Sequence, residues 1–154
     1  MPDPVSRRHI LLVEPNDASR AILRAAVRSL AHVETHAGFE SARARLGVVP
    51  FDFLVANIRL GAYNGLHLVY VASTLNGAST RAIVYSDDRD LALAREAQLA
   101  GAFYESRQTL PTTLAAYLTA ELPARDRRDP ARHDRRAIFR GGRRSSDALG
   151  GRSY

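Results

Sequence analysis

Residues 51–60, which read FDFLVANIRL, decide the fold of this chain. Within them, residues 53–58 form a run that is apolar except for Asn57. A continuous apolar run of this kind is typical of a strand in the middle of a parallel sheet, because both of its faces are covered. Asn57, near the end of this strand, is the residue that does most to decide which chemistry the chain can carry out.

The sequence on both sides of this run alternates short apolar stretches with amphipathic ones. Strands are expected at residues 9–13, around 33–35, at 53–58, at 81–86 and at 102–105. Helices are expected after residues 16–17, near 39–46, from 64–65 onward, from about 91 to 100, and from 111. This strict alternation indicates an α/β fold, a doubly wound domain with a parallel sheet.

The expected helices have apolar faces and polar starts. Asn16 or Asp17 is placed to cap the first helix, and Asp87 or Asp88 is placed to cap the fourth. The helical spacing predicts the following buried faces. They are Ile22, Leu23, Ala26, Val27 and Leu30 in the first helix (with Arg20, Arg24 and Arg28 opposite), Leu66, Val69, Ala72 and Leu75 in the third, and Leu114, Tyr117, Leu118 and Leu122 in the last.

The composition limits the class of protein. With 154 residues there is room for one domain of ordinary size and an appendage. The absence of cysteine excludes disulfides and thiolate metal sites, and it makes the cytoplasm the expected compartment. No run of about 18 apolar residues is present, so no membrane span is expected. All 22 basic residues are arginine.

The positive charge lies in the last part of the chain. Residues 1–123 carry 12 arginines and 12 acidic residues, whereas residues 124–154 carry 10 arginines and 4 aspartates. We therefore divide the chain into a domain at residues 8–122 and a flexible, Arg-rich tail at residues 123–154.

Three interpretations of this tail are open. Its arginines are candidates for contacts with nucleic-acid phosphates. Ile138 and Phe139 offer too little apolar surface for stable docking on a membrane. The aspartates between the arginines favour an unstructured tail or one that docks on a protein. The candidate anion-binding residues are Arg135, Arg136, Arg140, Arg143 and Arg144.

Several landmarks, in their order and spacing, resemble response-regulator receiver domains over residues 8–122. They are the strand with an acidic tip at 10–14, the central stretch at 52–60, the turn at 64–66, Ser86, and the approach to the fifth strand at 100–102. The resemblance implies a flavodoxin-like fold with five parallel strands in the order 2-1-3-4-5. It also implies that the functional groups meet at the carboxyl ends of the strands.

The resemblance identifies a phosphorylation pocket that has lost its main groups. In working receivers, two adjacent acids after the first strand and an acceptor aspartate hold Mg²⁺. Here the acid pair reads Glu14 and Pro15, and the acceptor position holds Asn57. An amide is a poor phosphoryl acceptor because it carries no negative charge and its nitrogen lone pair is delocalised. We expect neither Mg²⁺ binding nor another cofactor, no phosphotransfer, and no enzymatic activity.

Receivers also use a lysine that neutralises the transferring phosphoryl group and a hydroxyl that bonds the product. The lysine position falls at Arg107 or Gln108, and the hydroxyl is that of Ser86. Two interpretations of Arg107 are open. It pairs with Glu14 across the pocket, or it is an ordinary solvated arginine.

Other acids are weaker candidates for the chemistry. Asp52 is expected at the opposite edge of the sheet, roughly 16 Å from Asn57 at about 3.3 Å per residue. Asp87 and Asp88 are expected at the correct edge, but helix capping explains them more readily. The five histidines show no ligand spacing, and no metal site is predicted.

Three aromatic residues lie where receivers contact partners, on the face formed by the fourth helix, the fifth strand and the fifth helix. They are Phe103, Tyr104 and Tyr117. Tyr104 with Ser86 also matches the switch pair of receivers, although a strand-end serine and a half-buried tyrosine explain both equally well. We therefore expect a degenerate pseudo-receiver that signals through protein contacts, with a homodimer through that face. The alternative is a nucleic-acid-binding regulator that uses the tail on a dimerising platform.

Overall fold

The computed structural model describes residues 7–76 and 79–120, and it contains the predicted alternation of strands and helices. The tail predicted at residues 123–154, with its five candidate arginines, lies outside the described residues, as does Leu122. In chain order the elements are β1 (Arg8–Val13), α1 (Asp17–Val27), β2 (Ala31–His36), α2 (Phe39–Leu46), β3 (Phe53–Asn57), β4 (Arg59–Leu60), β5 (Tyr63–Asn64), α3 (Leu66–Asn76), β6 (Arg81–Ser86), α4 (Leu91–Leu99), β7 (Phe103–Ser106) and α5 (Leu110–Thr119).

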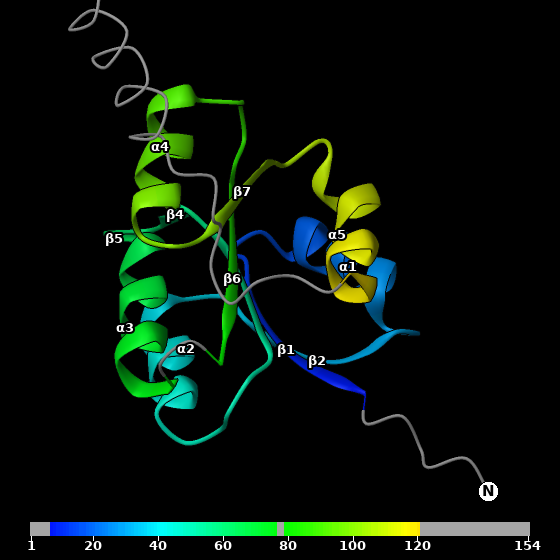
Figure 1. Ribbon diagram of the computed structural model, residues 1–154. Coiled ribbons are helices and arrows are strands. Elements are labelled where there is room, and N and C mark those ends of the chain that lie inside the picture. The colour runs from blue at the N-terminus through cyan, green and yellow to red at the C-terminus, as the bar shows by residue number, and fades with distance from the viewer. Residues whose placement is uncertain (1–6, 77–78, 121–154) are drawn as a thin grey trace, which may run out of the picture.

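Five of the strands form one parallel sheet in the order β2-β1-β3-β6-β7. Counted among these five strands alone, this is the predicted order 2-1-3-4-5, and the predicted fold class is confirmed. Helices α1 and α5 cover one face of the sheet, and α2, α3 and α4 cover the other (Figure 1). All five strands therefore present their carboxyl ends at one edge.

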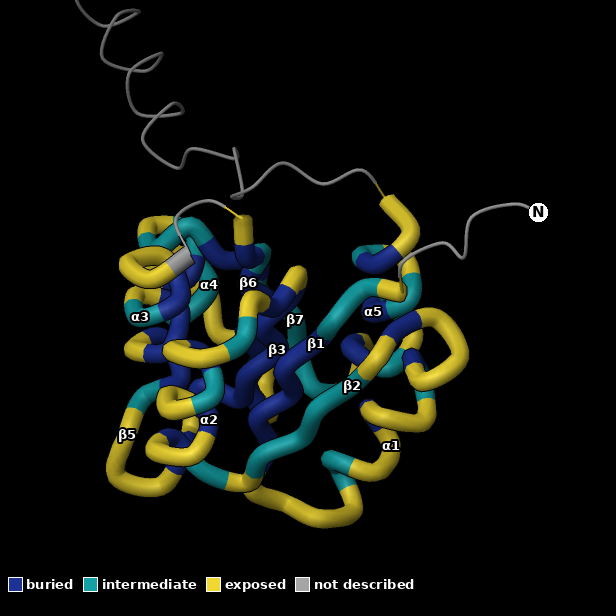
Figure 2. Tube along the Cα trace, turned by 90° about the horizontal axis from the view of Figure 1, so that it is seen from below, coloured by how far each residue is buried: buried dark blue, intermediate teal, exposed yellow. Residues whose placement is uncertain are grey.

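The central strand β3 explains why its sequence is apolar throughout. Phe53 and Val55 pack into the core beneath α1 and α5, whereas Leu54 and Ala56 pack into the core beneath α2, α3 and α4. Every residue of β3 is buried, as the dark blue strands in the middle of Figure 2 show. Since each fully buried large apolar side chain contributes roughly 1.5–3 kcal/mol, the position of this strand is strongly determined.

A small antiparallel hairpin follows β3, and the sequence did not predict it. Strands β4 and β5 are joined through Gly61, whose φ of 66° is in the left-handed region that glycine tolerates. The backbone N–H of Gly65 then donates to the Ile58 carbonyl at 2.7 Å. A Cβ on Gly65 would lie 2.2 Å from the carbonyl oxygen of Asn57, so only glycine allows this approach. The hairpin thereby fixes the start of α3 against the end of β3.

The helix caps agree with the sequence at α1 and differ at α4. Asn16 caps α1, because its side chain accepts a hydrogen bond from the Ser19 N–H at 2.9 Å. The prediction that Asp87 or Asp88 caps α4 is wrong. Asp90 is the cap and accepts from the N–H groups of the first turn, since it directly precedes the first helical residue. Asp87 is thereby available for another contact.

The predicted apolar faces were too wide. Leu23 and Val27 of α1 are buried, but Ile22 is 58% exposed and Leu30 is 42% exposed. Leu75 in α3 is likewise 53% exposed. These helices pack on the sheet through a narrow stripe, so apolar residues at its margins remain in contact with solvent. No helix among residues 7–76 and 79–120 is long and apolar enough to cross a membrane.

Candidate functional site

The carboxyl group of Glu14, directly after β1, is the centre of the candidate site. The residue is 1% exposed. Its Oε1 accepts from the Asn16 N–H at 3.0 Å and from Arg107 Nη2 at 3.5 Å. Its Oε2 accepts from Asn57 Nδ2 at 3.1 Å and from the Tyr85 hydroxyl. A buried carboxylate is tolerated only with such partners, and this one is surrounded by donors from four separate segments.

Asn57 is the last residue of β3, and both ends of its amide are used. Nδ2 donates to Glu14, and Oδ1 accepts from the Arg59 N–H at 2.9 Å. The side chain is buried, with the residue 5% exposed. An aspartate here would turn the donor into a second acceptor facing a carboxylate. The amide is therefore the group that suits this neighbour.

Tyr85 in β6 belongs to the site, and the sequence analysis missed it. It is fully buried, and it lies opposite Asn57 in the register of β3 and β6. Burial, together with its hydrogen bond to Glu14, raises the pKa of the Tyr85 hydroxyl, which therefore remains a donor. The sequence did contain one signal for including Tyr85 in the site: it carries a hydroxyl group near the carboxyl end of an apolar strand.

Arg107, just after β7, is the one of the two candidates for the lysine position whose side chain enters the site. Besides its contact with Glu14, its Nε donates to Asp87 Oδ1 at 2.6 Å and its Nη1 donates to Ser19 Oγ. Its guanidinium carbon lies 5.8 Å from the centroid of the Tyr85 ring. Gln108 is exposed. The ion pair with Glu14 is thus present in the structure, and Asp87 pairs with Arg107 instead of capping α4.

The residues present do not fit the Mg²⁺ site of a working receiver. Pro15 is exposed and has no ligating side-chain atom. Both oxygens of Glu14 are already hydrogen-bonded, and Asn57 Oδ1 is bonded to a backbone N–H. No group of three or more His, Asp or Glu side chains within the described ranges is arranged to hold a metal ion. Mg²⁺ prefers near-octahedral oxygen ligation with carboxylates, which this arrangement does not offer.

Ser86 and Tyr104 form a second cluster beside the first. Their hydroxyl groups lie within hydrogen-bond distance of each other and of the Asp88 carbonyl, so one hydroxyl donates to that carbonyl and the other donates either to it or to its partner hydroxyl. The Tyr104 hydroxyl accepts from the Asp90 N–H at 3.0 Å. Ser86 is buried and Tyr104 is half-buried. The structure therefore brings the side chains of Glu14, Asn57 and Arg107 together, whereas the side-chain hydroxyl of Ser86 contacts Tyr104 and the loop before α4.

Of the three aromatic residues predicted to meet a partner, one is buried and two are half-buried. Phe103 is 6% exposed and packs against the Tyr117 ring, with 5.6 Å between centroids. Phe103 thus belongs to the core, and its predicted role at a partner face stays a prediction. Tyr117 is half-buried and donates to Glu105 Oε1 at 2.7 Å. The exposed apolar residues near this face are instead Leu91 and Leu99 of α4, at 78% and 65% exposure.

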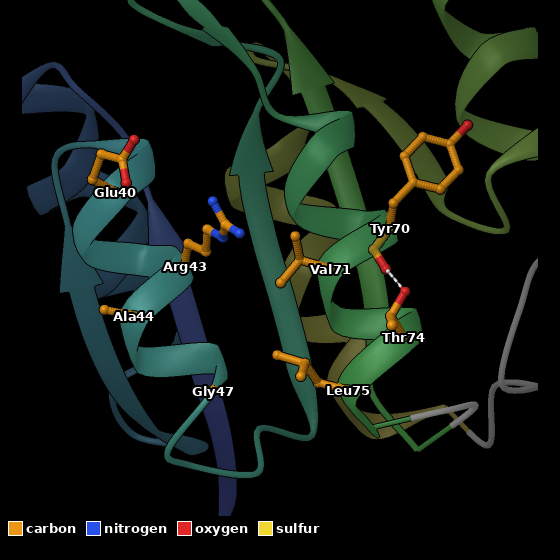
Figure 3. A pocket seen from close by; sticks show the side chains of 8 residues that line it. All are labelled: Glu40, Arg43, Ala44, Gly47, Tyr70, Val71, Thr74 and Leu75. Carbon is orange, nitrogen blue, oxygen red and sulfur yellow. Dashed lines mark hydrogen bonds between the residues drawn. The ribbon is translucent and has the colours of Figure 1, made fainter.

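Two other places lack the features of a receiver-type site. Asp52 lies at the opposite edge of the sheet, where its Oδ2 accepts from the His9 N–H at 2.7 Å, as expected for a residue at a strand entrance. A groove of about 620 Å³ lies between α2 and α3, with Arg43, Val71 and Leu75 pointing into it (Figure 3). The hydrogen bond drawn there lies within α3, between Thr74 and the carbonyl of residue 70. We therefore place the candidate site at the carboxyl ends of the strands.

Comparison with solved structures shows which proteins share this architecture. A response regulator receiver domain protein (CheY-like) from Methanospirillum hungatei JF-1 is 20% identical, with a TM-score of 0.64 over 73% of this chain and 94% of that chain. The chemotaxis protein CheY4 of Vibrio cholerae is 18% identical, with a TM-score of 0.68 over 75% of this chain and 99% of that chain. The chain has the fold of response-regulator receiver domains.

The receiver fold is also found in a structure described as adenylate cyclase from Rhodopirellula baltica. That structure is 18% identical, with a TM-score of 0.65 over 73% of this chain and 84% of that chain. No protein-family model and no curated protein matches the sequence. Because all of these identities are low, the likeness establishes the fold, and the function has to be argued from the site.

Proposed function

We propose that the chain is a degenerate receiver, a regulatory protein of the two-component type that acts without phosphorylation and through contacts with other proteins. The observation that carries this proposal is the hydrogen bond from Asn57 Nδ2 to Glu14 Oε2 at 3.1 Å. It joins the position of the phosphoryl acceptor to the first acid of the metal site. Both groups are thereby occupied with each other.

Arg107 supports the same conclusion from the other side of the pocket. Its guanidinium supplies positive charge next to the Glu14 carboxylate, where a receiver would hold a cation. It is itself held by Asp87 and Ser19. A network of this kind favours one arrangement of the strand-end loops, because a change of state would separate a buried carboxylate from its donors.

The proposed role is not enzymatic, because no group in the site is poised as a nucleophile. The Glu14 carboxylate is buried among donors, and Ser86 is hydrogen-bonded to Tyr104. Neither contacts a general base that would activate it within the described residues. What remains is a surface for recognition, in a protein that we expect to act in the cytoplasm.

The surface that we assign to partners, including a second copy of the chain, is formed by α4, β7 and α5. Leu91 and Leu99 are its exposed apolar residues. Between α4 and α5 a groove of about 350 Å³ is lined by residues that include Tyr104, Glu105 and Tyr117. Two exposed leucines beside a polar groove are a combination that protein interfaces use, with an apolar centre and a polar margin.

Phosphorylation is tested directly with a small phosphodonor and Mg²⁺. Intact-mass measurement should show no gain of one phosphoryl group, while a receiver that has the acceptor aspartate serves as the positive control. A stoichiometric, acid-labile adduct would overturn the proposal. The variant that combines Asn57→Asp with Pro15→Asp then tests whether the pocket can be restored. Its Mg²⁺ binding measures how much of the receiver geometry remains.

The partner surface is tested by the association of the chain with itself. Sedimentation should show a dimer that is weakened by the Leu91→Arg and Leu99→Arg substitutions. Ile22→Arg, which also replaces an exposed apolar residue but on α1, is the matched control and should leave the dimer intact. A chain that sediments as a monomer at every concentration would exclude the homodimer.

A further inference from the structure

A third groove lies between α1 and the edge strand β2, beside the strand-end site. Its volume is about 510 Å³. Its walls carry three arginines and one aspartate, with two alanines between them and a threonine from β2. The lining residues are Asp17, Arg20, Ala21, Arg24, Ala25, Arg28 and Thr35.

One of the three arginines in this groove has partners for its charge, and the other two do not within the described residues. Arg20 is paired with Asp17 and also donates from Nη1 to the Glu14 carbonyl at 2.9 Å. Arg24 and Arg28 are exposed, and their side chains have no hydrogen bond or ion pair within residues 7–76 and 79–120. Like charges one helical turn apart repel each other. An anion between them would relieve this repulsion.

The helix dipole explains only part of this arrangement. Basic residues near the carboxyl end of a helix are favourable by themselves, which accounts for Arg24 and Arg28 individually. It does not account for Arg20 in the first turn, nor for the small side chains of Ala21 and Ala25 between the arginines. The alanines leave the space along the helix open, so an extended anion can approach all three guanidinium groups.

The regular spacing of the three arginines suits a polymer with anionic groups at regular intervals. At a rise of about 1.5 Å per residue, Arg20, Arg24 and Arg28 lie roughly 6 Å apart along the helix and span about 12 Å in total. Successive phosphates of one strand of B-DNA advance about 3.4 Å along the duplex axis. The three arginines therefore face a stretch of about three to four phosphates.

The position of the groove connects it with the basic end of the chain. Helices α1 and α5 pack side by side on the same face of the sheet (Figure 1). Both run back from the carboxyl ends of the strands, so Arg28 and the last residue of α5, Thr119, lie toward the same edge. The ten arginines of residues 124–154 come after α5 in the sequence, beginning at Arg125. A polyanion that lies along α1 is thus near the end of α5, the last described helix.

We propose that the groove between α1 and β2 binds the phosphate backbone of double-stranded nucleic acid, without regard to sequence. Arginine donors without aromatic neighbours suit phosphates, and the groove lacks the stacking side chains that single-strand sites use. This inference goes beyond the proposed regulatory role and does not depend on the loss of phosphorylation. Its residues are distinct from those of the strand-end site, apart from the contact of Arg20 with the Glu14 carbonyl.

The test is a salt titration of duplex DNA binding with the full chain. Fluorescence anisotropy of a labelled duplex of arbitrary sequence measures affinity at increasing salt. Arg24→Glu with Arg28→Glu should lower the affinity about tenfold or more, and should reduce the slope of log K against log salt by about 1.8, because each lost phosphate contact contributes about 0.9. The matched control is Arg59→Glu with Arg95→Glu, which makes the same charge change at exposed arginines outside the groove. It should change the affinity by less than about threefold.

Each alternative outcome refutes the assignment. Absence of binding at low salt excludes nucleic acid. Equal losses in the groove and control variants would show that only net charge matters. If Arg143→Gln with Arg144→Gln abolishes binding while the groove variant keeps it, the tail alone is responsible. Polyglutamate that binds as tightly and with the same salt slope would show that the groove recognises acidic chains in general. Circular dichroism checks that every variant is folded.

Discussion

Replacing Asn57 by aspartate is the sharpest test of the strand-end site. In the wild-type chain Asn57 Nδ2 donates to Glu14 Oε2 at 3.1 Å, with both residues buried. Asn57→Asp places two carboxylate oxygens at this distance. Their repulsion is about 5 kcal/mol at an effective dielectric constant of about 20, before any relaxation. Arg107 and the uptake of a proton offset part of this, so we expect a net destabilisation of about 2–4 kcal/mol near neutral pH.

Urea unfolding followed by circular dichroism measures this change. The cost should shrink as the pH is lowered, because a proton on one of the two carboxyl groups restores a donor between them. The matched control is Asn16→Asp, since aspartate and asparagine cap a helix about equally well, and its stability should change by less than about 0.5 kcal/mol. If Asn57→Asp is as stable as the wild-type chain near neutral pH, the contact between Glu14 and Asn57 does not hold the site as described.

Three further predictions concern the surroundings of the site and the edge of the sheet. In thermal unfolding, Gly65→Ala should destabilise the fold by about 2–4 kcal/mol and disturb Asn57, because the new methyl group meets a backbone carbonyl. The control Gly47→Ala, where the nearest atom is 3.5 Å away, should show little cost or a slight gain in stability. The hydrogen bond from Arg45 lowers the pKa of Glu34 to about 2, so the ionised carboxylate stabilises the fold above the unfolded pKa of about 4.3, and this contribution disappears as the pH falls toward 2. Glu34→Gln should therefore be less stable than the wild type above a pH of about 4.3 and equally stable near a pH of about 2, and a difference that is the same at all pH values would contradict this. Because the pKa of Tyr85 is raised, its contribution to stability is complete below the unfolded tyrosine pKa of about 10 and declines at higher pH. Tyr85 should stay protonated while the chain is folded, so ultraviolet titration of the folded chain should count the same number of ionising tyrosines in the wild type and in Tyr85→Phe.

The main elements of the fold could be predicted because burial leaves a strong pattern in the sequence. β3 is covered on both faces and is therefore apolar throughout, and the predicted range 53–58 differs from the observed strand by one residue. The helix at 39–46 and the strand at 81–86 were predicted with the observed bounds. By contrast, strands β4 and β5 have two residues each, too few for any periodicity to be visible.

The site could be predicted only in part, because its contacts depend on tertiary neighbours. Glu14 and Asn57 were identified through the resemblance to receivers, which places functional groups at the ends of the predicted strands. The choice between Arg107 and Gln108 depends on the direction of the backbone after β7, which a pattern of residue types does not fix. Tyr85 was overlooked because a tyrosine in an apolar strand already suits a core, and only the facing carboxylate of Glu14 gives its hydroxyl a role.

The contacts of Arg107 have a consequence for the motions of the molecule. This one side chain reaches Glu14 after β1, Ser19 in α1 and Asp87 after β6, while its own backbone N–H donates to the Ser86 carbonyl at 2.8 Å. None of these segments can open by itself without breaking a contact with the same guanidinium group. We therefore expect their local unfolding to be coupled, so that this rim of the sheet opens as one cooperative unit in hydrogen exchange.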